Sequence, residues 1–215
     1  MDQKILFLIN RDWTSPALDW IMAVASSFDL WLLPIATLAL LVCWRGGFRA
    51  RAFLIVAVLA VAVNDGLISR NLKRLSDRPR PHQVLSGVRI VELAKAKFRP
   101  AALTRPLKVK SSRPRDERVD GRSLPSSHTM NTMAVALVCA AFFRGLGWLA
   151  FAPAGLVGYS RIYTGSHWPS DVLISVLLGL GVTLLLLGLF ERIWRKAGPR
   201  FLPVIAQAHP RLLDI

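Results

Sequence analysis

Long apolar stretches alternate with short clusters of charge along this chain. Residues 172–190 form 19 consecutive positions without a charged side chain, which is about the length that crosses ~30 Å of hydrocarbon. Four further stretches are also free of charge: residues 30–44, 52–64, 129–143 and 145–160. One such stretch fits in the core of a soluble protein, but five leave too little polar sequence to cover them. We therefore predict an all-α, polytopic membrane bundle of five to six helices.

The polar positions divide this bundle into parts. Residues 1–28 mix tryptophan and leucine with aspartate, which is typical of a segment that lies in the membrane interface or enters the bilayer partway. Residues 70–125 are predicted to form a long basic loop, with a short surface helix at residues 88–98. The chain of 215 residues fits one domain, residues 1–215.

Two polar residues, Asn64 and Asp65, interrupt the second apolar stretch. Polar residues inside a membrane helix usually face a cavity or a partner. An early end of the helix explains them equally well, and the sequence leaves both explanations open.

Composition favours a membrane protein over a soluble basic protein. The chain is 53% hydrophobic with a mean hydropathy of +0.42, yet its net charge is +15. A soluble basic protein spreads its charges, whereas residues 70–122 hold 16 Lys and Arg against five acidic residues. Cys43 and Cys139 each lie in an apolar stretch, so we interpret them as packed side chains and not as a disulfide or metal pair.

Three polar clusters fall at predicted helix ends. They are Lys73 with Arg80-Pro81 after six intervening residues, then Pro125-Ser126-Ser127-His128, and finally Ser160-Arg161, His167 and Asp171. Counting the helices between them places all three clusters on the same side of the membrane. We expect them to converge on one site.

The clusters together contain the groups that phosphoryl chemistry needs. Lys73, Arg80 and Arg161 supply positive charge for phosphoryl oxygens. Ser126 and Ser127 open a helix, where free backbone N–H groups bind anions.

The two histidines and the carboxylate complete this predicted site. Asp171 is expected in the first turn of the last helix, where it can reach back to Nδ1 of His167 and leave Nε2 free to attack. His128 is suited to protonate a leaving oxygen and later to deprotonate water. Singly, each cluster is more typical of a basic turn, a helix cap or a surface pair. Their order and shared side favour the site.

The three clusters resemble the three-part signature of the type 2 phosphatidic acid phosphatase (PAP2) superfamily. The resemblance covers about residues 73–171. It implies that His167 is the nucleophile, with Asp171 as its orienter and His128 as the general acid. It also implies that phosphate is bound by five residues and that neither metal nor cofactor is required; these residues are Lys73, Arg80, Ser126, Ser127 and Arg161.

One position departs from that signature, because Ser127 stands where the family usually has glycine. If the backbone there has positive φ, serine costs about 1 kcal/mol relative to glycine. If the position is the first turn of a helix, serine serves equally well, and we favour this second case.

The resemblance implies an enzyme, a metal-independent lipid phosphatase that acts through a phosphohistidine. The expected substrate is a phosphomonoester or diphosphate on a membrane lipid, either a prenyl diphosphate or a phosphatidyl-type lipid. Two alternatives remain: a lipid-to-lipid phosphotransferase that uses the same histidine, and a non-catalytic basic protein that binds anionic lipid or nucleic acid. We expect the protein to interact with its lipid substrate and with an anionic membrane surface. We do not expect it to bind nucleic acid. The sequence decides neither the lipid nor the oligomeric state.

Sidedness is a point of conflict. The resemblance implies a multi-pass protein of the bacterial cytoplasmic (inner) membrane whose active site faces the periplasm. The positive-inside rule opposes this orientation, because the active-site side has 16 Lys and Arg in its loop and the other side has nine in total. Long loops weaken that rule, and we keep the periplasmic orientation. Residues 89–122 either gather anionic lipids or are simply solvated.

Overall fold

The computed structural model describes residues 1–113 and 122–213, so part of the predicted basic loop, residues 114–121, lies outside the described residues. The chain begins with α1 (Asp2–Phe7), a π-helical turn (Leu8–Asp12) and α2 (Pro16–Ser26). Ser15 caps α2 by accepting a hydrogen bond from the Leu18 amide, with Pro16 at the first helical position.

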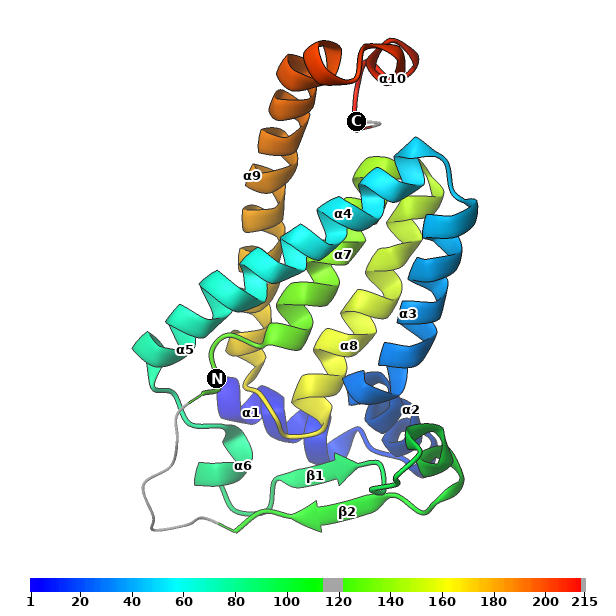
Figure 1. Ribbon diagram of the computed structural model, residues 1–215. Helices are drawn as coiled ribbons and strands as arrows, with labels where there is room; N and C mark the ends of the chain where they lie inside the picture. Colours follow the sequence, from blue (N-terminus) through cyan, green and yellow to red (C-terminus); the bar gives the residue numbers. More distant parts are fainter. Residues whose placement is uncertain (114–121, 214–215) are drawn as a thin grey trace.

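This N-terminal segment is more deeply packed than its composition predicted. Leu6 and Met22 are almost fully buried, in one cluster with Val91 of the basic loop and Tyr163. These helices form the floor of the bundle (Figure 1), and their position at the interface or partway into the bilayer stays a prediction.

Five helices make up the bundle above that floor (Figure 1). They are α3 (Phe28–Arg45), α4 (Phe48–Ala62), α7 (Ser127–Phe142), α8 (Phe151–Tyr163) and α9 (Pro169–Phe201). Among the described residues, three helical stretches are long and apolar enough to cross a membrane: Phe28–Arg45, Phe48–Val84 and Pro169–Phe201. The all-α membrane prediction is confirmed, although α7 and α8 are shorter than a full crossing at 16 and 13 residues.

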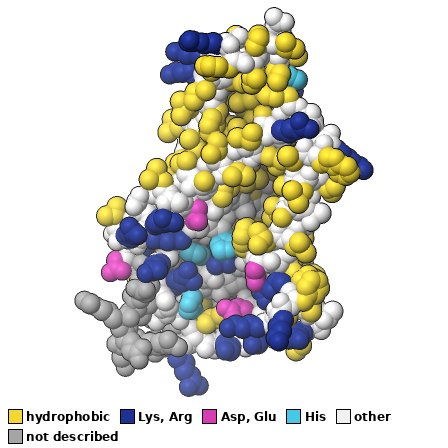
Figure 2. All heavy atoms as spheres, in the orientation of Figure 1, with side chains coloured by type: hydrophobic (Ala, Val, Ile, Leu, Met, Phe, Trp, Pro, Cys, Tyr) yellow, Lys and Arg dark blue, Asp and Glu magenta, His cyan; other side chains and the backbone are white. Residues whose placement is uncertain are grey.

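The outer face of the bundle is apolar and its interior holds small side chains. Leu38, Val58 and Leu185 are 62%, 67% and 77% exposed, and Figure 2 shows hydrophobic side chains over the middle of the molecule. Inside, Gly179 lets α7 and α9 approach, because a Cβ there would stand 2.6 Å from the carbonyl oxygen of Met130. Small residues at helix contacts and apolar residues outside are the arrangement that a bilayer requires. The protein is membrane-embedded.

The second apolar helix does not end at Asn64. α4 runs on through a π-helical segment (Val63–Ser69) into α5 (Arg70–Ser76). Asn64 is buried and its amide donates to the Thr183 hydroxyl of α9 at 3.2 Å, whereas Asp65 is exposed. Of the two explanations that the sequence left open, a partner is correct for Asn64.

The basic loop contains a two-stranded sheet where a short helix was predicted. It holds α6 (Pro81–Val84), β1 (Arg89–Glu92), a 3-10 helix (Arg99–Thr104) and β2 (Lys108–Ser111), with the two strands antiparallel. The helix prediction for residues 88–98 was wrong because its branched residues pair with β2 and bury Val88 and Val91 against the floor. An ion pair of Arg89 with Asp19 holds the loop to that floor, and a second one, of Arg99 with Asp29, holds it to the first turn of α3.

The C-terminal segment, with α10 (Pro203–Ala208), folds back against the far end of α9. Glu191 accepts the Leu212 and Leu213 amides at 2.9 and 3.1 Å. The ring of His209 stacks on Phe48 with 5.1 Å between centroids.

Candidate active site

The short loop between α8 and α9 positions His167. Gly165 has φ +68°, a left-handed conformation that glycine adopts freely, and its carbonyl lies 2.9 Å from Nδ1 of His82. The His167 side chain that follows is buried, and its Nδ1 lies 2.6 Å from the carbonyl oxygen of Ser123. A carbonyl only accepts, so Nδ1 carries the proton of the neutral ring and Nε2 keeps its lone pair.

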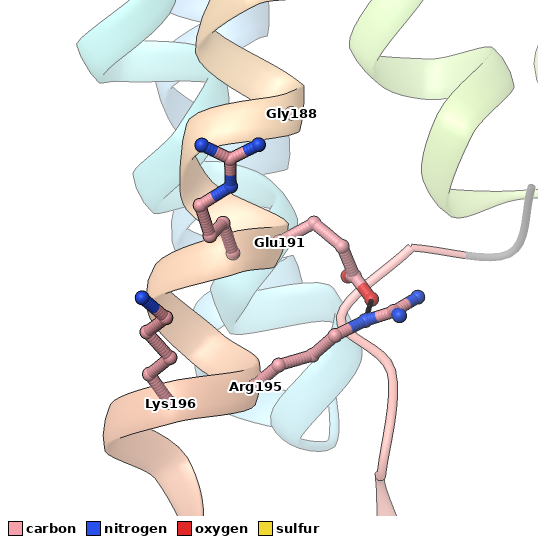
Figure 3. A pocket seen from close by; sticks show the side chains of 5 residues that line it. Gly188, Glu191, Arg195 and Lys196 are labelled. Atoms are coloured by element: carbon pink, nitrogen blue, oxygen red, sulfur yellow. Dashed lines mark hydrogen bonds and ion pairs between the residues drawn. The ribbon is translucent and has the colours of Figure 1, made fainter.

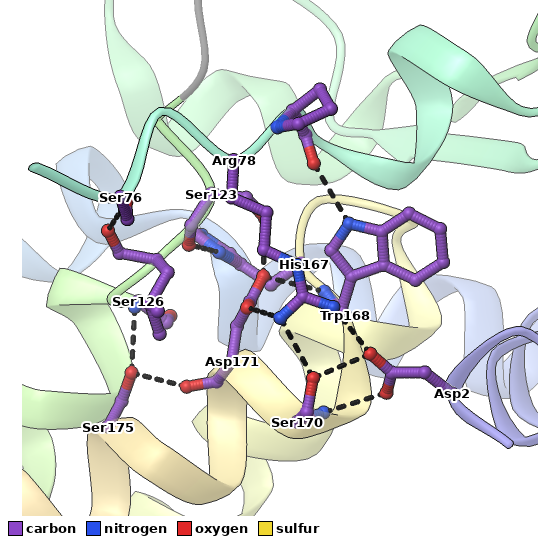
Figure 4. Close-up of polar contacts among 12 residues, drawn as sticks. Asp2, Ser76, Arg78, Ser123, Ser126, His167, Trp168, Ser170, Asp171 and Ser175 are labelled. Carbon is purple, nitrogen blue, oxygen red and sulfur yellow. Dashed lines mark hydrogen bonds and ion pairs between the residues drawn. The ribbon is translucent and has the colours of Figure 1, made fainter.

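Asp171 lies where it was predicted, but it does not contact the imidazole directly. Its Oδ2 accepts the Trp168 amide at 3.2 Å, closing the first turn of α9. The same oxygen accepts the Ser123 hydroxyl, and Oδ1 accepts a hydrogen bond from Arg78. The predicted contact of Asp171 with Nδ1 of His167 was wrong, because the Ser123 main chain occupies that position (Figure 4).

Asp171 therefore reaches the histidine through one intermediate residue. Ser123 donates its hydroxyl to the carboxylate and accepts the imidazole N–H on its carbonyl. The backbone amide of Ser123 is held in turn by the carbonyl of Arg78 at 2.9 Å. Ser123 precedes the second sequence cluster by two residues, and no pattern in the sequence marked it.

Arg78 is a second site residue that the sequence did not single out. Its guanidinium contacts Asp171, the Ser170 hydroxyl at 2.9 Å and the Asp2 carboxylate at 2.6 Å (Figure 4). Asp2 also accepts the Ser170 amide at 2.9 Å. Arg78 lies between Lys73 and Arg80 in the first cluster, so its position in the sequence could have marked it as a site residue. Asp2 offered none.

The three predicted cations act electrostatically on His167. Burial lowers the pKa of His167 well below its usual 6.5, and the charges of Arg161, Arg80 and, more weakly, Lys73 lower this pKa further. The same three charges act on the ring of His128. Lys73 of the first cluster also donates to the Ser127 hydroxyl of the second at 2.5 Å, and residues of all three clusters therefore act on one another in this region.

Arg161 is the most enclosed of these cations. It donates to the hydroxyl and the carbonyl of Ser26, at the end of α2. Its Nε is buried and has no hydrogen-bond partner within residues 1–113 and 122–213. A buried donor without a partner is costly, and a phosphoryl oxygen is an acceptor that fits this position.

Ser126 and Ser127 have different surroundings. The amide of Ser126 donates to the Ser175 hydroxyl at 2.7 Å, so this N–H does not face the site. Its hydroxyl accepts from Thr129. Ser127 has its hydroxyl 2.5 Å from Lys73 Nζ and 2.7 Å from the Ser69 hydroxyl.

The backbone at Ser127 settles the departure from the family pattern. Ser127 is the first residue of α7, and among the described non-glycine residues only Asp77 has positive φ. The first-turn interpretation is confirmed, so serine causes no left-handed strain. The Met130 amide is the first of α7 to find an acceptor in the preceding turn, the carbonyl of Ser126 at 3.0 Å, so the amides of Ser127, His128 and Thr129 lack such an acceptor and can bind an anion.

His128 is the second residue of α7, and the edge of its ring meets Phe28 with centroids 6.1 Å apart. The site thus combines cations, helix-start amides and two imidazoles, a set of groups that suits a phosphoryl group. Among the described residues, no three His, Cys, Asp or Glu side chains group closely enough to hold a metal ion.

Relatives with known names share parts of this chain. It is 40% identical over 58 residues to the bacitracin transport permease protein BcrC of Bacillus licheniformis, covering 27% of this chain and 29% of that protein. It is 36% identical over 58 residues to undecaprenyl-diphosphatase BcrC of Bacillus subtilis, covering 27% and 30%. It is 33% identical over 88 residues to the lipid A 4'-phosphatase of Porphyromonas gingivalis, covering 40% and 35%. These matches span only about a third of the relatives' own lengths.

Two solved structures share the fold. Aquifex aeolicus LpxE superposes with a TM-score of 0.60 at 22% identity, covering 87% of this chain and 94% of that chain. A transmembrane PAP2-type phosphatidylglycerolphosphate phosphatase from Bacillus subtilis superposes with a TM-score of 0.53 at 21% identity, covering 89% and 87%. The PAP2 superfamily profile matches residues 49–195, which contain all three polar clusters. The chain belongs to the PAP2 superfamily.

Proposed function

We propose that the protein is a membrane lipid phosphatase that transfers the phosphate of an anionic lipid first to His167 and then to water. One observation carries the proposal. His167 is buried, its Nδ1–H is held by a main-chain carbonyl, and three cations act on its ring. A neutral imidazole with a free Nε2 in a positive pocket is suited to attack phosphorus.

The reaction proceeds in two steps. Nε2 of His167 forms a bond to phosphorus while the bond from phosphorus to the lipid oxygen breaks, and that oxygen takes a proton from His128. His128 then removes a proton from water, which attacks the phosphohistidine. The phosphorus–nitrogen bond breaks, and inorganic phosphate leaves with both histidines returned to their starting states.

The surrounding residues stabilise charge and hold geometry. Lys73, Arg80 and Arg161 neutralise the phosphoryl oxygens in the transition state, and the hydroxyls of Ser126 and Ser127 add hydrogen bonds. Asp171 is a positioning residue that acts through Ser123. This assignment replaces the direct contact that the sequence predicted.

The chemistry of the pocket selects an anionic lipid headgroup. The named relatives include an undecaprenyl-diphosphatase and a lipid A 4'-phosphatase, and a structural neighbour is a phosphatidylglycerolphosphate phosphatase. All three names describe a lipid with a terminal phosphate. We propose a substrate of this class, either a phosphomonoester or a diphosphate.

We further propose that the protein lies in the cytoplasmic membrane with its active site facing the periplasm or outside. The charge count opposes this orientation, but Arg89 and Arg99 of the basic loop are ion-paired with Asp19 and Asp29. Paired charges contribute less to the positive-inside bias. Single cysteines at Lys108 and Arg144, in a chain without Cys43 and Cys139, test the orientation. An impermeant thiol reagent applied to intact cells labels only Lys108→Cys if the proposal holds.

The function is tested by phosphate release from purified protein in detergent. The substrates are undecaprenyl diphosphate, phosphatidylglycerophosphate, phosphatidic acid and lipid A, each with and without a chelator. His167→Ala is expected to abolish phosphate release. The control His209→Ala removes an imidazole at the far end of the bundle and should retain release. Full activity of His167→Ala ends the mechanism. Labelled phosphate that appears on a second lipid instead of in water identifies a phosphotransferase.

A further inference from the structure

A cleft lies at the end of α9 that is farthest from the active site. It has a volume of about 430 Å³ and is lined by Gly188, Glu191, Arg192, Arg195 and Lys196. An adjoining cavity of about 370 Å³ continues along the helix past Leu184, Leu187 and Leu213. Figure 3 shows Glu191 and Arg195 reaching toward each other beside the C-terminal segment.

The cleft stands at the edge of the apolar part of α9. The uncharged stretch of this helix ends at Phe190, two residues before Arg192. Its 19 residues span about 28 Å of helix, close to the thickness of the hydrocarbon core. Arg192 and Lys196 therefore lie at the depth of the lipid headgroups, on the side opposite the active site.

Two of the basic side chains that line the cleft are free to bind an anion. Glu191 is already satisfied by Arg195 Nε at 2.6 Å and by two backbone amides of the C-terminal segment. Arg192 and Lys196 bond to no side chain in the part of the chain that the structure describes. They lie four residues apart and so point from one face of the helix.

The other half of the cleft is apolar and open. Gly188 precedes Arg192 by one helical turn, and a Cβ on it would meet no atom within 4 Å. Leu184, one turn earlier, is 55% exposed. The absent side chain at Gly188 leaves a notch that joins the cationic end to the membrane-facing leucines.

We propose that this cleft binds one anionic glycerophospholipid of the leaflet opposite the active site. The phosphate lies between Arg192 and Lys196, and an acyl chain lies along Gly188 and Leu184. Charge followed directly by an apolar groove matches an amphiphile, and neither free phosphate nor a neutral lipid uses both halves. The proposal is independent of catalysis.

The proposal is tested by titrating purified, delipidated protein with phosphatidylglycerol in detergent and counting bound lipid by native mass spectrometry. The double variant Arg192→Gln/Lys196→Gln is expected to bind the first lipid about tenfold more weakly at low salt. The matched control Arg45→Gln/Arg144→Gln removes the same charge from the same end of the bundle. It should remain within about twofold of wild type.

The apolar half has its own variant. Gly188→Phe fills the notch, into open space, and should weaken binding of phosphatidylglycerol but leave the unfolding temperature of the lipid-free protein unchanged. Phosphatidylcholine should bind more weakly than phosphatidylglycerol. Inorganic phosphate should not displace bound phosphatidylglycerol. Equal losses in the cleft variant and its control, or wild-type binding by both cleft variants, would overturn the proposal.

Discussion

The two ends of this bundle are both rich in arginine and lysine, but the burial and the bonding partners of these side chains differ between the ends. Figure 2 shows basic side chains at both ends, with apolar side chains between them. At the active-site end Arg161 is enclosed and bonded to Ser26, and Lys73 meets Ser127. At the far end Arg192 and Lys196 stand on an exposed helix face.

This difference comes from what covers the helix ends. The N-terminal helices and the basic loop pack under the active site and exclude water, so charges there act strongly on their neighbours. At the far end the C-terminal segment packs against α9, but Arg192 and Lys196 stay exposed, so water screens their charges. Residue type alone does not separate a catalytic cation from an interfacial one. Burial and partners do.

The largest expected contrast is between Arg161 and a far-end arginine. Arg161→Gln should lower kcat/KM about 10²–10³-fold, because it removes a donor from the transition state in a site that water does not screen. Arg144→Gln, at the far end, should change it less than about twofold. Both are measured as phosphate release in detergent. Equal effects would mean that Arg161 acts only as a general surface charge.

The next contrast concerns the link between Asp171 and His167. We expect Asp171→Asn and Ser123→Ala each to lower kcat about 10- to 100-fold, because each loosens the loop that holds Nδ1. Since they interrupt one chain of contacts, the double variant should be little worse than either single variant. Kinetic measurement of all four proteins decides this. If the losses in kcat are additive, or if Ser123→Ala has the kcat of wild type, Asp171 does not act through Ser123. The direct contact of Asp171 with the imidazole would then be the better explanation.

A smaller effect is expected from the ion pairs. Arg78→Gln leaves the fully buried Asp171 without its cation and should lower the free energy of unfolding by about 2 kcal/mol. Arg195→Gln breaks the pair with Glu191, in which the arginine is 55% exposed, and should cost less than about 1 kcal/mol because water screens this cation. Denaturant unfolding in one detergent compares the two. A larger loss for Arg195→Gln contradicts the comparison.

The last expected effect is a dependence of stability on pH. Burial and nearby cations hold the pKa of folded His167 below 6.5, so the unfolded chain binds more protons in that interval. Stability should therefore fall as pH drops below about 6.5, by up to about 1.4 kcal/mol per pH unit. His167→Gln should flatten this slope in unfolding measurements between pH 5 and about 7. An unchanged slope would show that His167 titrates normally.

The sequence predicted the helices and the convergence of the three clusters, because apolar length and polar residues at helix ends are local signals. It could not predict which group holds Nδ1 of His167. A carboxylate four residues away is the expected partner, and a carbonyl 44 residues earlier is visible only after folding. The same limit applies to Asp2, which lies 76 residues from Arg78.

The strands of the basic loop were missed for a similar reason. Residues 88–98 have no clear period, and the antiparallel pairing of Arg89–Glu92 with Lys108–Ser111 makes the first part of this segment extended. Tertiary pairing decided the local structure there.

The hydrogen bond from His167 to the main chain of Ser123 has a consequence for genetics. Every amino acid at position 123 carries the same carbonyl oxygen, so no codon change there deletes the acceptor. A screen that replaces one residue at a time will find the hydroxyl of Ser123 and miss its carbonyl. The backbone path around Ser123 therefore determines which nitrogen of His167 carries the proton. Only an insertion, a deletion or another change in that backbone path can remove the acceptor.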